Sequence, residues 1–141
     1  WLMRNLTLAL YKNKGMQQLL IWELSDDNAT TRRTSKLREI VNEPSIRMLE
    51  KTFSGSGLDI NVISAMMISG IYYLVLHRNR SLFCDVDFNS KAGKDRLRLG
   101  VKQMSSMLFA QINRQKEMLQ IAERLRSEGV SEEIIGKCIP V

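Results

Sequence analysis

The chain has 141 residues, enough for one domain with a single core, and 44% of them are hydrophobic. Only two prolines and eight glycines interrupt this content, which favours a folded helical protein and excludes a disordered one. The formal net charge is +6, but the basic residues are scattered, which is typical of solvated helix faces. Because the chain begins with Trp1 instead of Met, we expect it to be a fragment or a processed chain.

Helical spacing of apolar residues predicts four helices in the first third of the chain. They cover residues 2–10, 16–25, 30–41 and 44–53. Asp26, Asp27 and Asn28 end the second helix and offer caps for the third. Pro44 is expected to separate the third helix from the fourth, because proline is favoured in a first helical turn.

The remaining two thirds also predict helices and no strand. A long apolar helix follows Asp59, a good N-cap, and a loop at 83–90 leads to a helix that continues well beyond Phe109. Gly129 is expected to end it, before a short final helix around Ile135. The predicted fold is an all-α bundle of about seven helices. We expect one domain over residues 1–110 and a helical extension over 111–141.

The residues that usually carry catalysis or bind metals are sparse. His77 is the single histidine, Cys84 and Cys138 match no metal-ligand spacing, and no nucleophile–base motif occurs. The loop from Asp85 to Asn89 alternates carboxylates and an amide as a calcium loop does, but Ser90 replaces the required glycine. We therefore expect no enzyme activity, no metal site and no cofactor, in a protein of the reducing cytoplasm.

The segment Ile60 to Leu76 carries no charge, yet it falls short of the ~20 residues of a membrane span and contains polar residues. We interpret it as a buried interface helix and not as a membrane anchor. Together with the next long helix it predicts a homodimer, because both helices are apolar on more than one face. The expected interface residues are Ser69, Gly70, Tyr72, Leu76, Gly100, Met107 and Ala110.

Apolar side chains and a few polar groups also suggest a pocket for a small apolar molecule. Met66, Tyr73 and His77 recur on one face of the long apolar helix, and Trp22 and Met48 could add apolar contacts. Glu23 lies in an apolar run and needs a partner, or it faces the pocket as an acidic anchor. The expected ligand residues are thus Trp22, Glu23, Met48, Met66, Tyr73 and His77. The competing interpretation is a filled core without a cavity.

Two stretches carry a family resemblance. Met16 to Glu39 resembles the helix pair that opens the regulatory domain of TetR/AcrR-type repressors, and Ile60 to Leu108, with its GIYYLVLHR helix, is similar to that family's last two helices. The two stretches together cover about half of the chain. It implies an all-helical ligand-binding domain that dimerises through its last two helices, and repression that a small molecule relieves.

On this resemblance the chain lacks the N-terminal helix-turn-helix domain, so operator DNA would be bound only through that missing part. The tail from Gln111 to Val141 exceeds the usual end of the domain. Two other functions remain as alternatives: a small basic helical module that binds RNA or a protein directly, and an interaction protein without a ligand. The salt dependence of heparin retention separates the first from a regulatory domain.

Overall fold

The computed structural model describes residues 2–138, and the described residues form six α-helices and no strand. In chain order they are α1 (Leu2–Lys12), α2 (Lys14–Ser25), α3 (Ala29–Phe53), α4 (Ile60–His77), α5 (Lys91–Ser127) and α6 (Glu132–Cys138). The all-α prediction is confirmed. The chain divides into two compact units, Trp1–Gln103 and Met104–Val141, and the boundary falls inside α5. The predicted domains, 1–110 and 111–141, also divide within α5, and their ends at residues 1 and 139–141 lie outside the described residues.

The expected break at Pro44 is wrong, because α3 is one continuous helix of 25 residues with Pro44 inside it. A proline within a helix removes one hydrogen bond and crowds the carbonyl four residues earlier. That carbonyl belongs to Ile40, and both Ile40 and Pro44 are exposed, so water can solvate the freed group. The two helices predicted at 30–41 and 44–53 are therefore a single element, and six helices replace the expected seven.

The predicted caps at the starts of α3 and α4 are confirmed. The Asn28 side chain accepts hydrogen bonds from the backbone N–H groups of Thr30 and Thr31, and the Thr31 hydroxyl accepts one in return from the Asn28 backbone. This reciprocal arrangement fixes the start of α3. The Asp59 carboxylate accepts from the Val62 backbone at the start of α4. Both caps satisfy N–H groups that a helix cannot pair internally.

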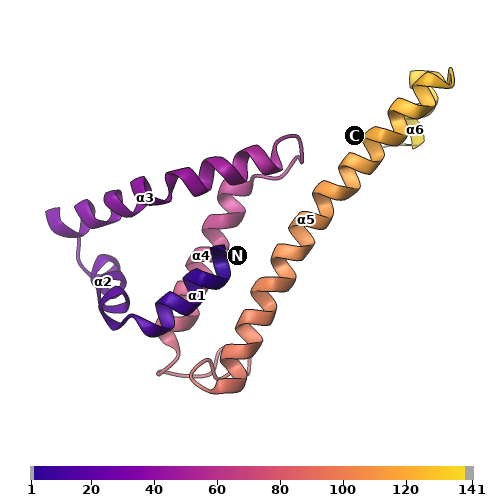
Figure 1. The fold of residues 1–141 in the computed structure, drawn as a ribbon. Helices are drawn as coiled ribbons and strands as arrows, with labels where there is room; N and C mark the ends of the chain where they lie inside the picture. The colour runs from indigo at the N-terminus through magenta and orange to yellow at the C-terminus, as the bar shows by residue number, and fades with distance from the viewer. Residues whose placement is uncertain (1, 139–141) are drawn as a thin grey trace. The chain divides into compact units, whose positions relative to one another are not determined.

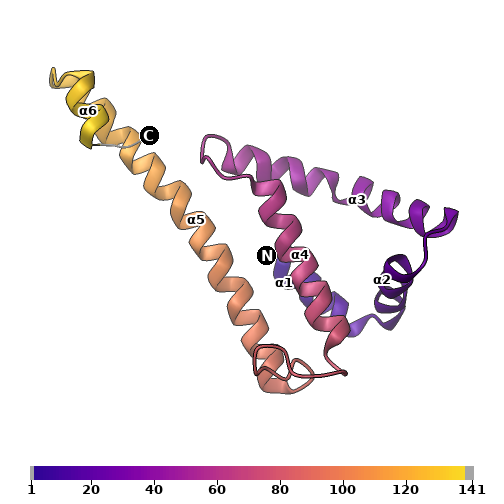
Figure 2. The same ribbon diagram turned by 180° about the vertical axis from the view of Figure 1, so that it is seen from behind.

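In the first unit, α1 lies beside α4, and α3 crosses over them from α2 to the loop that precedes α4 (Figures 1 and 2). Two apolar side chains, Leu10 of α1 and Val75 of α4, are completely buried. They belong to one apolar cluster with Leu20, Ile71, Val86, Phe88, Leu97 and Val101. The core therefore lies where α1, α4 and the first turns of α5 meet, at one end of the unit.

The segment between α4 and α5, predicted as a loop, is a tight hairpin that closes this core. Phe83 and Val86 exchange two backbone hydrogen bonds of 3.1 Å, and Cys84 and Asp85 between them both have positive φ. This is the pattern of a two-residue type I′ turn. The turn lets Val86 be buried, and the backbone close to it approaches α5 so tightly that a Cβ on Gly93 would lie 1.9 Å from the Asp87 carbonyl oxygen.

The second unit contains the C-terminal part of α5 and the short α6. Gly129 has φ +84°, and the backbone N–H of Val130 donates to the Leu125 carbonyl at 3.0 Å, which ends α5 as expected. Ala122 and Ile135 are buried between the two helices. The predicted continuation of α5 beyond Phe109 and the final short helix are both confirmed.

Among the described residues, α4 is the one helix that is long and apolar enough to cross a membrane by length and composition. A core helix of a globular protein passes the same test, so the finding alone is weak evidence for a span. Only four of the eighteen residues of α4 are buried. Much of its apolar surface therefore remains open to another partner.

Candidate functional site

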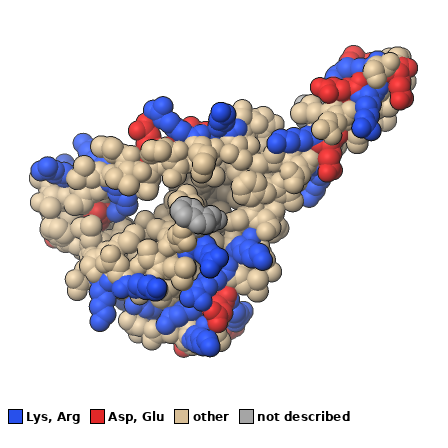
Figure 3. Space-filling model, viewed as in Figure 1, with Lys and Arg blue, Asp and Glu red and all other residues tan. Residues whose placement is uncertain are grey.

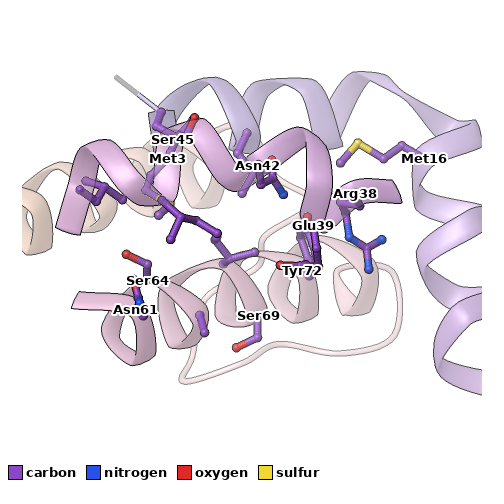
Figure 4. A pocket seen from close by; sticks show the side chains of 16 residues that line it. Met3, Met16, Arg38, Glu39, Asn42, Ser45, Asn61, Ser64, Ser69 and Tyr72 are labelled. Carbon is purple, nitrogen blue, oxygen red and sulfur yellow. The ribbon is translucent and has the colours of Figure 1, made fainter. Parts of the chain in front are cut away.

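A cavity of about 520 Å³ lies within the first unit, between α3 and the pair formed by α1 and α4 (Figure 4). Its volume falls in the range of 300–1,000 Å³ that is typical of small-molecule sites. Most of its surface is apolar, from Leu2, Met3, Leu6, Met16, Ile46, Leu49, Ala65, Ile68 and Tyr72. The polar and charged lining residues are Arg38, Glu39, Asn42, Ser45, Asn61, Ser64 and Ser69.

The cavity exists because small side chains occupy the facing positions of two helices. On α4, Ser64, Ala65 and Ser69 line it, and Ser45 lines it from α3. Protein cores are normally filled to high density, so short side chains at facing positions leave space. The three short side chains of α4 therefore border a cavity between helices of the same chain.

Arg38, which lines one end of the cavity, forms an ion pair that joins α3 to α2. Nη1 of Arg38 lies 2.6 Å from Oε2 of Glu23. The Thr34 hydroxyl donates to the other carboxylate oxygen of Glu23 at 2.8 Å. The Glu23 side chain is only 6% exposed. Burial acts to raise the pKa of Glu23, but the hydrogen bonds from Thr34 and Arg38 outweigh it and hold the pKa below its usual value. Glu23 thus has the partner that its apolar surroundings require.

Tyr72 reaches the cavity from α4 near this ion pair (Figure 4). Burial raises the pKa of its hydroxyl, and the charge of Arg38 opposes that effect in part. The phenol is therefore neutral at physiological pH, and it offers one hydrogen-bond donor and acceptor. Arg38 and Glu39, from adjacent positions on α3, add one positive and one negative charge to the lining.

None of the six residues predicted to bind the ligand lines this cavity. Met48 and Met66 are 61% and 69% exposed, and the Trp22 indole donates to the Asp26 carboxylate. Met48 lies ten residues beyond Arg38 on α3, about 15 Å along the axis, which separates it from the contacts of Glu23. The assignment of these residues to a ligand stays a prediction.

Tyr73 and His77, which were predicted to share a face of α4, form an exposed aromatic group with Phe83. The rings of Tyr73 and His77 stack with centroids 5.1 Å apart, and Phe83 meets the Tyr73 ring edge-on at 5.4 Å. The ring nitrogen Nε2 of His77 is 2.8 Å from the Ser81 hydroxyl. The two side chains are thus together, as the spacing predicted, but away from the cavity.

The residues predicted for the dimer interface differ in their surroundings. Met107, Ala110 and Ser69 are exposed, whereas Gly70 and Gly100 are half-buried, with open space where a Cβ would project. Leu76 packs against the core, and Tyr72 lines the cavity together with Ser69. The exposed apolar positions of α4 are instead Val62, Met66 and Tyr73.

Sequence reasoning missed the polar residues of the cavity, above all Asn42, Ser45 and Asn61. Asn42 lies two residues before the break expected at Pro44, and that break would separate it from Ser45. A useful signal was present in α4, where Ser64 and Ser69 interrupt an otherwise apolar helix. Polar residues of this kind in an apolar helix indicate either contact with another helix or a cavity.

The described residues contain no group of three or more His, Cys, Asp or Glu side chains that could hold a metal ion. Cys84 and Cys138 are both exposed and unpaired by any disulfide. The cavity walls carry hydroxyl and amide groups, the paired Arg38 and the exposed Glu39. Such polar groups in an apolar wall suit binding. Comparison with protein-family models, curated proteins and solved structures finds no match for this chain.

Proposed function

We propose that this chain is the effector-binding and dimerisation domain of a TetR-like bacterial transcription regulator, a repressor in its full-length form. The observation that carries the proposal is the cavity between α1, α3 and α4, whose size and largely apolar wall suit a small organic molecule. In this proposal the protein is cytoplasmic, has no catalytic activity, and binds operator DNA only through a separate helix-turn-helix domain.

A stripe of exposed residues on α4 supports the dimer. Val62, Met66, Ser69 and Tyr73 follow one another at spacings of four, three and four, and all four are exposed. This is the spacing by which one helix packs along another. Gly70 borders the stripe, and nothing lies within 4 Å of the position that its Cβ would take, so a second helix could approach closely. A second copy of the chain is the simplest partner, because closed two-fold symmetry is common.

The same helix serves both proposed roles. α4 contributes Ser64 and Ile68 to the cavity wall and Met66 to the exposed stripe. A ligand changes a conformational equilibrium only if it binds one conformation better than the other. A ligand that favours one position of α4 would therefore also change the surface that α4 presents to its partner.

The dimer can be tested with two methionines that are similarly exposed. Met66→Glu places a charge in the α4 stripe and should convert a dimer into a monomer in sedimentation velocity at micromolar concentration. Met48→Glu, on α3 and 61% exposed, is the matched control and should leave the dimer intact. A monomeric wild type, or equal effects of the two substitutions, would contradict the proposed dimer.

The charge of +6 is the observation that favours the alternative, a basic module that binds RNA or a protein directly. Lys and Arg side chains are spread over several elements on the face shown in Figure 3, with Asp and Glu among them. Several arginines are paired, including Arg32 with Asp27 and Arg47 with Glu43. A steep loss of heparin retention with salt would favour this alternative, because each phosphate contact releases counterions.

A further inference from the structure

We infer that the proposed effector site takes an uncharged, mainly apolar molecule that carries one or two hydroxyl or carbonyl groups. This inference rests on the proposed effector-binding function and specifies the class of its ligand. Three features of the cavity carry it: unpaired neutral polar groups, a charged pair that is already satisfied, and an apolar wall.

The first feature is a set of neutral polar side chains that line the cavity from two helices. Asn42 and Ser45 belong to α3, and Ser64 belongs to α4 (Figure 4). Within residues 2–138, none of these three side chains has a hydrogen-bond partner in the protein. Among the described residues, every buried side-chain nitrogen or oxygen has a hydrogen-bond partner. The polar atoms of these three side chains have none, so they are accessible to solvent or to a ligand. An amide and two hydroxyls can both donate to and accept from a neutral polar group of a ligand.

The second feature is that the cation in the lining is already paired. Arg38 is held by Glu23 at 2.6 Å, and it lies at one end of the cavity, away from Ser45 and Ser64 (Figure 4). An anionic ligand would have to compete with a carboxylate that is almost fully buried. Glu39 is exposed, so water screens its attraction for a cationic ligand. The formal charges of Arg38 and Glu39 cancel in the lining.

The third feature is the wall around the unpaired groups. Ile46 and Leu49 of α3 and Ile68 of α4 surround them with hydrocarbon. A charged ligand group would lose water there without gaining an opposite charge, whereas a hydroxyl or carbonyl could replace its water contacts with Asn42, Ser45 or Ser64. The cavity therefore discriminates by charge more than by the shape of the apolar part.

The test uses three ten-carbon probes that differ only in their head group: 1-decanol, decanoate and decylammonium. Isothermal titration calorimetry at pH 7 on the intact chain should show that decanol binds at least about tenfold more tightly than either ion, the ratio expected when a charge is buried without a partner. Ser64→Lys should reverse the order and favour decanoate. Ser64→Leu, which adds bulk without charge, should weaken all three probes together.

The outcomes separate the ligand class from the site. If decanoate or decylammonium binds as tightly as decanol and Ser64→Leu weakens it, the cavity is the site but the inferred neutral class is wrong. If no probe binds, or if Ser64→Leu leaves binding unchanged, the proposed effector site itself is overturned. Circular dichroism of each variant shows whether the fold is kept, and Ser45→Lys repeats the charge reversal from α3 if Ser64→Lys does not fold.

Discussion

The two ends of the first unit use the same helices in opposite ways. At the end formed by the hairpin, Leu10 and Val75 are fully buried and Gly93 leaves room for backbone contact. At the other end, Leu6 on α1 and Ser64 on α4 face a cavity of about 520 Å³. The packed end holds α1 and α4 in place, and the hollow end leaves space between helices. In the proposed function, one helix pair supplies both a rigid base and the ligand site.

The largest expected difference between the two ends comes from two leucines one turn apart on α1. Leu10→Ala should reduce the free energy of unfolding by about 3 kcal/mol, because it removes buried contacts and leaves a void. Leu6→Ala enlarges a cavity that already exists and should cost about 1 kcal/mol. Urea denaturation of both variants measures the difference. Equal losses would show that the two ends are packed alike.

A smaller effect is expected from the Glu23–Arg38 pair, which links α2 to α3 beside the cavity. Glu23→Gln should lower the free energy of unfolding by about 1–2 kcal/mol at pH 7, because it weakens a charge-assisted contact at a nearly buried position. The pKa of Glu23 is lowered from 4.5 in the folded state, so the carboxylate stabilises the protein above that pH. This contribution should disappear as the pH falls through the folded-state value.

The control for Glu23 is Glu43→Gln, which removes an ion pair with Arg47 whose side chains are both more than half exposed. Such surface pairs contribute about 0–1 kcal/mol. Wild type and Glu23→Gln should converge in stability on acidification, while Glu43→Gln should follow the wild type throughout. A constant gap between wild type and Glu23→Gln from pH 7 to pH 3 would contradict the role given to the pair.

The smallest expected effect concerns a single hydrogen bond at the packed end. The Tyr11 hydroxyl donates to the Phe88 carbonyl at 2.9 Å, and it links α1 to the hairpin. Tyr11→Phe should lower the midpoint of thermal unfolding by the equivalent of about 1 kcal/mol. Tyr73→Phe removes a hydroxyl from a half-exposed ring and should have almost no effect. A larger loss for Tyr73→Phe would show that its hydroxyl has a structural partner.

The packed end was the more predictable of the two. Apolar spacing places α1, α4 and α5, and short-range capping by Asn28 and Asp59 fixes where α3 and α4 begin. Val86 and Phe88 escaped prediction as core residues because a short segment rich in polar residues is read as a loop. Their burial depends on the turn at Cys84 and Asp85, where both residues have positive φ. Asp is favoured in such a turn, but Cys84 stands at the other central position and no glycine marks it.

The sequence predicts either a ligand pocket or a filled core, and the residues that it assigns to the pocket differ from those that line the cavity. A pocket depends on which faces of non-adjacent helices meet, and the spacing of Met66, Tyr73 and His77 shows only that they share a face. On that face Met66 and Tyr73 are exposed and His77 is half-buried. The break expected at Pro44 also hid the continuity of α3, so Arg38, Asn42 and Ser45 were not recognised as successive positions along one wall. Spacing and caps therefore predict individual helices better than they predict which helix faces pack together.

The eight methionines allow the cavity to be tested directly. With ¹³C-methyl-labelled methionine, addition of 1-decanol should shift the methyl signals of Met3 and Met16, which line the cavity. The signals of Met48 and Met66, exposed and outside it, should stay in place. That result is the one expected if the hollow end of the first unit is an effector site. Shifts of Met48 and Met66 with Met3 and Met16 unchanged would contradict the account and would favour the site predicted from sequence.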